Sequence, residues 1–265
     1  MTAFQKVIKY LAIGFAIFLI FTIVSGITAA ISGIGSIFTK KENTKIIEKK
    51  DLNSLSSYLD IDLKRATLNI KKSNRLYVEV SSNDIKISEK ENKVIIEDKS
   101  KKSIFNYKKE TVNLYVPEDF KYDLINIDTG AGDLNIEYLN TKKLLLELGA
   151  GKTVIDSVYS DNSKINTGAG SFTINDGQLT DTNIDVGVGK LEVKAKFYGK
   201  NKIDTGVGSV KLILIDNDYG LHIDKGIGSI TLNGDKIKKD SYYGNGENTI
   251  DISGGIGSIN INVLK

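Results

Sequence analysis

Apolar and polar residues alternate in short runs from about residue 60 to residue 261. Examples from the first part of this region are Leu76–Val80, Val94–Glu97 and Val112–Val116. Alternation over four to six residues, interrupted by polar clusters, is typical of β-strands. Pro117 follows the third run, at a point where the strand no longer needs a backbone donor. The pattern predicts that this region is built from strands.

A Gly-small-Gly triplet recurs seven times between residues 127 and 261, and its first glycines are separated by 19, 19, 19, 19, 20 and 29 residues. A fixed period of this kind indicates stacked repeats that bury their apolar faces against one another. The fourteen glycines are Gly130, Gly132, Gly149, Gly151, Gly168, Gly170, Gly187, Gly189, Gly206, Gly208, Gly226, Gly228, Gly255 and Gly257.

Apolar positions flank each triplet. An Ile or Leu stands three residues before every first glycine, from Ile127 to Ile252, and mostly apolar residues stand two and four residues after the second glycine. The two sets are out of step by one residue in a period of two, so a bend must separate two strands. Glycine permits such a bend and has no Cβ to collide with neighbouring repeats. We therefore assign the fourteen glycines to structural corners, and expect the residue between them to point inward.

These features predict an all-β fold, a parallel β-solenoid with coils of about 19 residues stacked at roughly 4.8 Å, with right-handed coiling preferred. Residues 127–265 would form the Gly-x-Gly repeats. Residues 60–126 would form an irregular N-terminal β part that covers the open edge of the first repeat. A separate small β domain is the alternative for residues 60–126, and a β-sandwich is the alternative for the repeats.

The N-terminus carries a run of 30 uncharged residues, from Tyr10 to Thr39, which is long enough to cross a bilayer as a helix. Lys6 and Lys9 precede this run. We expect a short cytoplasmic N-terminus (1–9), a transmembrane helix (10–39), a linker (40–59) and an extracytoplasmic remainder in a single-pass membrane protein. The alternative is a cleaved signal peptide, for which the apolar core is long.

Composition excludes several classes of function. The chain has 265 residues, a net charge of +3 and no cysteine. The small, evenly spread charge argues against a nucleic-acid partner, and the lack of cysteine rules out disulfides, thiolate metal sites and cysteine nucleophiles. His222 is the only histidine, and we expect it at the surface. Because no catalytic group stands beside His222, we assign it no catalytic role. We assign no catalytic, cofactor-binding or metal-binding role to any other residue either.

Three local patterns have structural interpretations. The Gly-x-Gly triplets lack the third glycine and the helix of a dinucleotide-binding fingerprint. The segment 254–259 has Ile259 where a calcium-binding nonapeptide repeat has aspartate. A column of mostly acidic side chains stands two residues before each triplet. We expect lysines close in sequence to lie between these side chains and neutralise their repulsion. The alternative is that bound cations bridge them. The column consists of Asp128, Glu147, Asn166, Asp185, Asp204, Asp224 and Ser253, and the lysines are Lys143, Lys164, Lys202 and Lys225.

The 29-residue step inserts about ten residues near 234–248. Insertions in repeat proteins form loops, and aromatic and basic loop residues often bind partners. The alternative is a tolerated loop with no binding role; if the loop binds, the candidate partner-binding residues are Lys236, Lys238, Lys239, Tyr242 and Tyr243. The last coil would expose unpaired strand edges, so either the insertion or another molecule should cover it. We expect an envelope protein or polymer to bind at this C-terminal end of the solenoid.

The segment 116–136 carries a family resemblance. It runs from Val116-Pro117-Glu118 to Ile127-Asp128-Thr129-Gly130-Ala131-Gly132-Asp133-Leu134-Asn135-Ile136, and the further triplets follow it. With these motifs, residues 60–265 resemble the putative adhesin family of bacterial proteins, β-strand-repeat domains of unknown function that are usually held by an N-terminal membrane helix. The resemblance implies a non-enzymatic role in adhesion or envelope-stress signalling, and it supplies no catalytic residues.

Two other functions remain open at this stage. One is an enzyme that acts on cell-surface polysaccharide, with carboxylates such as Asp185 and Asp204 supplied by neighbouring coils. The other is a structural oligomer whose coils stack end to end.

Overall fold

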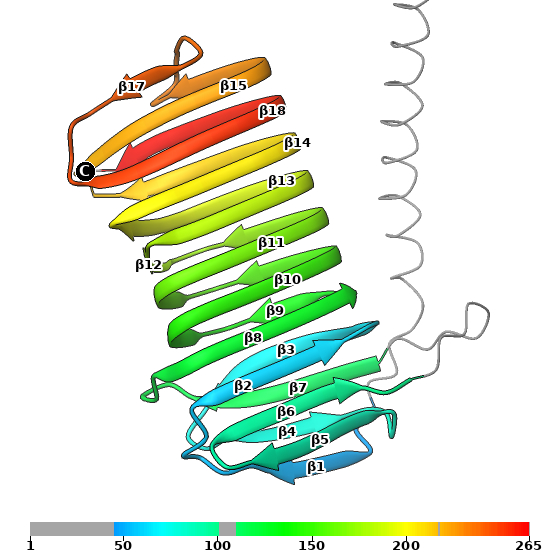
Figure 1. The fold of residues 1–265 in the computed structure, drawn as a ribbon. Coiled ribbons are helices and arrows are strands. Elements are labelled where there is room, and N and C mark those ends of the chain that lie inside the picture. The colour runs from blue at the N-terminus through cyan, green and yellow to red at the C-terminus, as the bar shows by residue number, and fades with distance from the viewer. Residues whose placement is uncertain (1–44, 101–109, 217, 265) are drawn as a thin grey trace, which may run out of the picture. The chain divides into compact units, whose positions relative to one another are not determined.

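The structure, a computed structural model, describes residues 45–100, 110–216 and 218–264. These residues form an 18-stranded β-sheet (Figure 1). Within them there is no helix that could cross a membrane. The predicted cytoplasmic segment (1–9) and transmembrane helix (10–39) lie outside the described residues.

The strands succeed one another with short connections. They are β1 (Glu48–Asp51), β2 (Tyr58–Leu63), β3 (Ala66–Ser73), β4 (Tyr77–Val80), β5 (Ile85–Lys90), β6 (Lys93–Asp98), β7 (Glu110–Pro117), β8 (Tyr122–Ala131), β9 (Leu134–Ile136), β10 (Leu139–Ile155), β11 (Val158–Ile174), β12 (Gly177–Thr180), β13 (Thr182–Tyr198), β14 (Lys200–Ile215), β15 (Tyr219–Leu232), β16 (Asp235–Lys236), β17 (Ser241–Tyr243) and β18 (Asn248–Leu264).

Successive repeats pair in parallel and in register. Leu146 of β10 lies beside Ile165 of β11, and Ile165 lies beside Ile184 of β13. Equal repeat length gives this result, because each strand then meets the equivalent strand of the next coil. The all-β class and the parallel stacking at a 19-residue offset are confirmed, and the fold is solenoid-like.

The second glycine of most triplets has an unusual backbone conformation. In six repeats the second glycine has φ between +125° and +152°, a region that residues with a side chain rarely adopt. A Cβ at these positions would also collide with the carbonyl oxygen of the second glycine in the adjacent coil. These six glycines are Gly151, Gly170, Gly189, Gly208, Gly228 and Gly257.

The core is a set of stacked aliphatic columns. Every residue three positions before a triplet is buried, from Ile127 to Ile252. The prediction was wrong for the residue between the glycines, which is partly exposed in the first five repeats; Ile227 and Ile256 are 66% and 44% exposed. The bend at the corner turns this side chain outward.

The last repeat in the sequence does not end the array. β18 pairs in parallel with β14 on one side and with β15 on the other. Figure 1 shows this strand, in red, between two strands that precede it in the chain. We expected the C-terminal coil to be terminal, and this expectation was wrong: the terminal coil is formed by β15.

The N-terminal strands continue the same sheet. β2 and β3 pair in parallel with β8 and β9, and thereby cover the first Gly-x-Gly coil. On their other side they pair in parallel with β6 and β7. Ile61, for example, lies between Ile96 and Ile127. These pairings do not support a separate domain. The predicted linker (40–59) extends too far, because β1 and the start of β2 lie within it.

Antiparallel strands close both ends of the parallel array, but to different extents. At one end β5 pairs with six residues of β6, and β4 pairs with four residues of β7. At the other end β17 pairs with residues 221–223 of β15, and β16 with residues 231–232. The corner of β15, residues 224–230, therefore has no strand on its outer side among the described residues.

Candidate functional site

The insertion between β15 and β18 covers part of the terminal coil. Among the predicted partner-binding residues, Lys236, Lys238 and Tyr242 are exposed, the last at 75%. Lys239 donates a hydrogen bond to the carbonyl oxygen of Gly226, and Tyr243 is partly buried against the core. Lys239 is exposed as well, so four of the five side chains face solvent, while Lys239 and Tyr243 hold the insertion on β15.

His222 joins the insertion to the terminal coil. Its Nδ1 lies 3.2 Å from Asp251 Oδ1, and its Nε2 lies 3.1 Å from Asp240 Oδ1. Its ring stacks on Tyr242 with a centroid distance of 4.3 Å. The hydrogen bond to Asp240, with a smaller contribution from Asp251, raises the pKa of His222. The two carboxylates lie on opposite sides of the ring, so the cluster has the geometry of a clamp.

The sequence did not reveal these partners of His222. Asp240 belongs to the insertion and Asp251 to a strand that is displaced from chain order, so spacing along the chain gives no signal for either contact. Lys225 is also unexpected. It is only 4% exposed, although we placed it beside the polar column, and its Nζ donates to the carbonyl oxygen of Ile227. Burial lowers the pKa of Lys225.

The predicted polar column exists and extends into the N-terminal part. Asp62 of β2 lies beside Asp128, and the register continues through Glu147, Asn166, Asp185, Asp204 and Ser253 to Asp224. Burial, together with Asp204, raises the pKa of Asp185. Lys202, one of the lysines expected to interleave with the column, pairs with Asp204 of its own strand at 2.6 Å. The described residues contain no group of three metal-binding side chains.

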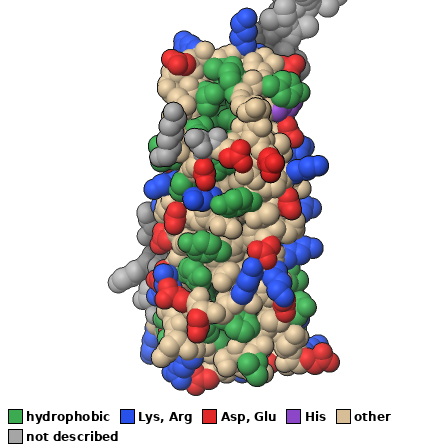
Figure 2. Space-filling model, turned by 90° about the vertical axis from the view of Figure 1, so that its left-hand side faces the viewer, with side chains coloured by type: hydrophobic (Ala, Val, Ile, Leu, Met, Phe, Trp, Pro, Cys, Tyr) green, Lys and Arg blue, Asp and Glu red, His purple; other side chains and the backbone are tan. Residues whose placement is uncertain are grey.

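Charges of both signs are mixed over the surface. Figure 2 shows one face of the molecule, on which basic and acidic side chains alternate with apolar ones and with uncharged surface. Several of the charges pair between strands, for example Lys211 with Glu192 at 2.7 Å and Lys49 with Glu79 at 3.3 Å. The face in Figure 2 carries no basic stripe of the kind that binds nucleic acid.

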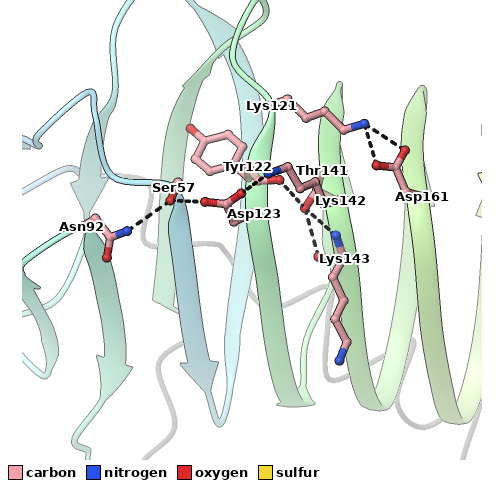
Figure 3. A network of polar contacts seen from close by, with 9 residues as sticks. All are labelled: Ser57, Asn92, Lys121, Tyr122, Asp123, Thr141, Lys142, Lys143 and Asp161. Carbon is pink, nitrogen blue, oxygen red and sulfur yellow. Dashed lines mark hydrogen bonds and ion pairs between the residues drawn. The ribbon is translucent and has the colours of Figure 1, made fainter.

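A polar network ties the N-terminal part to the first repeats (Figure 3). Ser57 Oγ donates to Asp123 Oδ2 at 2.7 Å, and Lys142 Nζ lies 2.7 Å from Asp123 Oδ1. Asn92 Nδ2 donates to Ser57 Oγ. The ammonium of Lys142 and the hydroxyl of Ser57 lower the pKa of Asp123. A carboxylate with a lowered pKa is a weak base, so this Ser-Asp pair is suited to holding strands together rather than to nucleophilic catalysis.

A second surface cluster, around Tyr77 and Tyr115, was not predicted from the sequence. The rings of Tyr77 and Tyr115 stack at 4.1 Å, from antiparallel strands β4 and β7. Lys49 lies 4.1 Å from the centroid of Tyr77, and Tyr115 donates to Glu79. Because these rings are already in contact with each other and with cations, they form a cross-strand ladder instead of an open aromatic platform.

Comparison with known structures gives several bacterial relatives of low identity. A putative cell adhesion protein from Clostridium sporogenes is 19% identical, with a TM-score of 0.36, over 83% of this chain and 100% of that chain. A putative adhesin from Bacteroides fragilis is 14% identical, with a TM-score of 0.45, over 82% and 97%. One from Parabacteroides distasonis is 16% identical, with a TM-score of 0.40, over 83% and 97%. No curated protein matches the chain.

Comparison with protein families is more decisive. The Toastrack DUF4097 model matches residues 56–232. The match begins just before β2, ends with β15 and includes six of the seven glycine triplets, so it covers most of the sheet described above. The resemblance that the sequence carries to the putative adhesin family is thereby confirmed. The chain belongs to the Toastrack DUF4097 family.

Proposed function

We propose that this protein is a non-enzymatic binding or scaffold module of the cell envelope, anchored in the membrane by residues 10–39, with its β-sheet on the extracytoplasmic side. The observation that carries the proposal is the use of polar side chains along the array. They bridge neighbouring coils, as Asn166 does to Glu147 and Asn175 does to Asp156. Such an array is a stiff support for a binding surface.

The insertion end is the proposed binding surface for an envelope protein or polymer. Tyr242 and the lysines Lys236 and Lys238 are exposed there. Exposed aromatic and basic side chains on a well-supported loop are typical of protein interfaces. Adhesion and envelope-stress signalling both require such a surface, and the identity of the partner would distinguish them.

Binding can be tested by crosslinking in intact cells followed by capture of the full-length chain. The test variant carries Lys236→Ala, Lys238→Ala and Tyr242→Ala. A matched control carries Lys86→Ala, Lys90→Ala and Leu55→Ala, which remove two exposed lysines and one exposed apolar side chain (76%) far from the insertion. We expect a specific partner to be lost from the test variant only. Loss from both, or from neither, would contradict the proposed surface.

Orientation in the membrane can be tested with introduced cysteines, because the chain contains none. Lys90→Cys places a thiol on the exposed strand β5, and Gln5→Cys places one in the predicted cytoplasmic segment. We expect a membrane-impermeant maleimide to label Lys90→Cys in intact cells, and Gln5→Cys only after lysis. The opposite pattern would overturn the proposed topology. Recovery of the chain in the soluble fraction would overturn the anchor.

A polysaccharide-acting enzyme is the second candidate. Asp185, Asp204 and Asp224 line a shallow depression of about 520 Å³, and the pKa of Asp185 is raised, as a general acid requires. The test is hydrolysis of envelope glycans by the wild type and by Asp185→Asn and Asp204→Asn. Activity that both substitutions abolish, with the fold intact, would support this function; no activity, or activity in both variants, would exclude these carboxylates.

A further inference from the structure

Among the described residues, antiparallel strands cover a smaller part of the outer edge of β15 than of β6 or β7 at the opposite end. At the opposite end, antiparallel strands cover six residues of β6 and four of β7. On β15 they cover only residues 221–223 and 231–232. The intervening corner carries Ile227, which is 66% exposed. An uncovered strand edge offers backbone groups to another strand.

One backbone carbonyl of this corner is placed to accept a hydrogen bond from a further coil. In the first Gly-x-Gly coil the amide of Ala131 donates to the carbonyl oxygen of Lys64 in the coil beneath, at 2.8 Å. Through the repeats, the first-glycine carbonyl of each coil points at the first glycine of the next coil, in an unbroken series that ends where Gly226 stands over Gly255. The carbonyl oxygen of Gly226 is therefore the one that would receive a donor from a further coil.

Lys239 supplies that donor. Its Nζ donates to the carbonyl oxygen of Gly226, from a position in the insertion between β16 and β17. The ammonium thus occupies the place of the amide that an additional coil would provide. Lysine on a strand edge opposes pairing with a further strand, because pairing would require the charge to be displaced or desolvated.

We propose that the insertion, through Lys239, is a cap that prevents the corner of β15 from pairing with the same edge of a second copy of this chain. A second copy is the partner that fits, because it offers the same uncovered corner, residues 224–230, with an equally exposed Ile227. Two identical edges meet about a two-fold axis, which makes the pairing antiparallel and closes the assembly at a dimer.

The cap can be removed in two ways. Lys239→Met deletes the ammonium, and Lys238→Met changes its exposed neighbour as a matched control. Replacement of residues 235–243 by a Gly-Ser segment of equal length removes β16, β17 and Lys239 together. The readout is the mass of the purified full-length chain, in detergent, by light scattering after size exclusion across a range of concentrations.

We expect Lys239→Met to dimerise at a concentration at least tenfold lower than the wild type and Lys238→Met. Within this concentration range the wild type and Lys238→Met should remain monomeric. We expect the Gly-Ser variant to be dimeric throughout, with amides of residues 224–230 protected from hydrogen exchange. A folded Gly-Ser variant that stays monomeric would overturn the proposal, and so would a wild type that dimerises as readily as the variants. Because Lys239 is exposed, the single substitution tests the proposal even if the segment replacement does not fold.

Discussion

Gly189 stands directly against the carbonyl oxygen of Gly170 in the adjacent coil, and its φ is +144°. Two separate constraints thus act on one position. The backbone angle disfavours any residue with a side chain, and the neighbouring carbonyl leaves no room for a Cβ. The relationship explains why a glycine recurs at this position in successive coils, and it can be tested by substitution.

Gly189→Ala should destabilise the protein by about 3 kcal/mol or more, because strain and overlap add. Gly234→Ala is the matched control. Gly234 has φ +89°, and a Cβ there would meet nothing within 4 Å, so only the backbone strain of about 1–2 kcal/mol should remain. Urea denaturation of both variants measures the difference. Equal losses would show that the close approach of the coils is unimportant.

The aliphatic columns should dominate stability. Ile203 is fully buried between Ile184 and Ile252, so Ile203→Ala should cost about 2–5 kcal/mol through lost contacts and a residual cavity. Ile227→Ala removes the same side chain at a position that is 66% exposed, and should change stability by less than about 0.5 kcal/mol. A similar loss in both variants would contradict the assignment of inward and outward positions.

The His222 clamp should depend on pH. Both ring nitrogens face carboxylate oxygens, so the charged imidazole is favoured, and the folded pKa lies above the ordinary 6.5. Its stabilisation is complete below the unfolded pKa and is lost as the pH rises through the folded pKa. Hydrogen exchange of β17, corrected for intrinsic rates, should therefore lose protection above neutral pH.

His222→Gln is the control for that measurement, because its side chain does not titrate. We expect protection of residues 241–243 in this variant to be low and independent of pH. If the variant kept the pH dependence of the wild type, the clamp would have to be assigned to another group.

Asp123 should stabilise the junction between β2 and β8 with the opposite pH dependence. Its pKa is lowered, so its contribution is present above the unfolded value near 3.8 and disappears as the pH falls through the folded value. Asp123→Asn should be less stable than the wild type at pH 7, and the difference should vanish in acid. Denaturation at several pH values tests this, with Asp161→Asn, which removes only the exposed pair with Lys121, as control.

The repetitive part of the fold could be predicted because it is local. The repeat length, the Ile and Leu columns and the one-residue shift in the apolar alternation at Gly130–Gly132 are all visible within 19 residues. Each coil then repeats the same arrangement. The order of the coils could not be predicted, because the apolar columns of β15 and β18 are nearly identical and either strand could pair with β14. Similarly, the contacts of His222 and Lys239 depend on how the insertion crosses the terminal coil, and no periodic pattern encodes that path.

The insertion of β18 between β14 and β15 has a consequence for biosynthesis. During synthesis β15 emerges before β18, so it has no correct parallel neighbour until residues 248–264 have been made. Until then β14 offers an edge to which β15 could bind in its place, since both carry the same columns. Completion of this end therefore has to follow translation of the last coil, and a chain that stops before residue 248 lacks an interior layer of the array as well as its last strand.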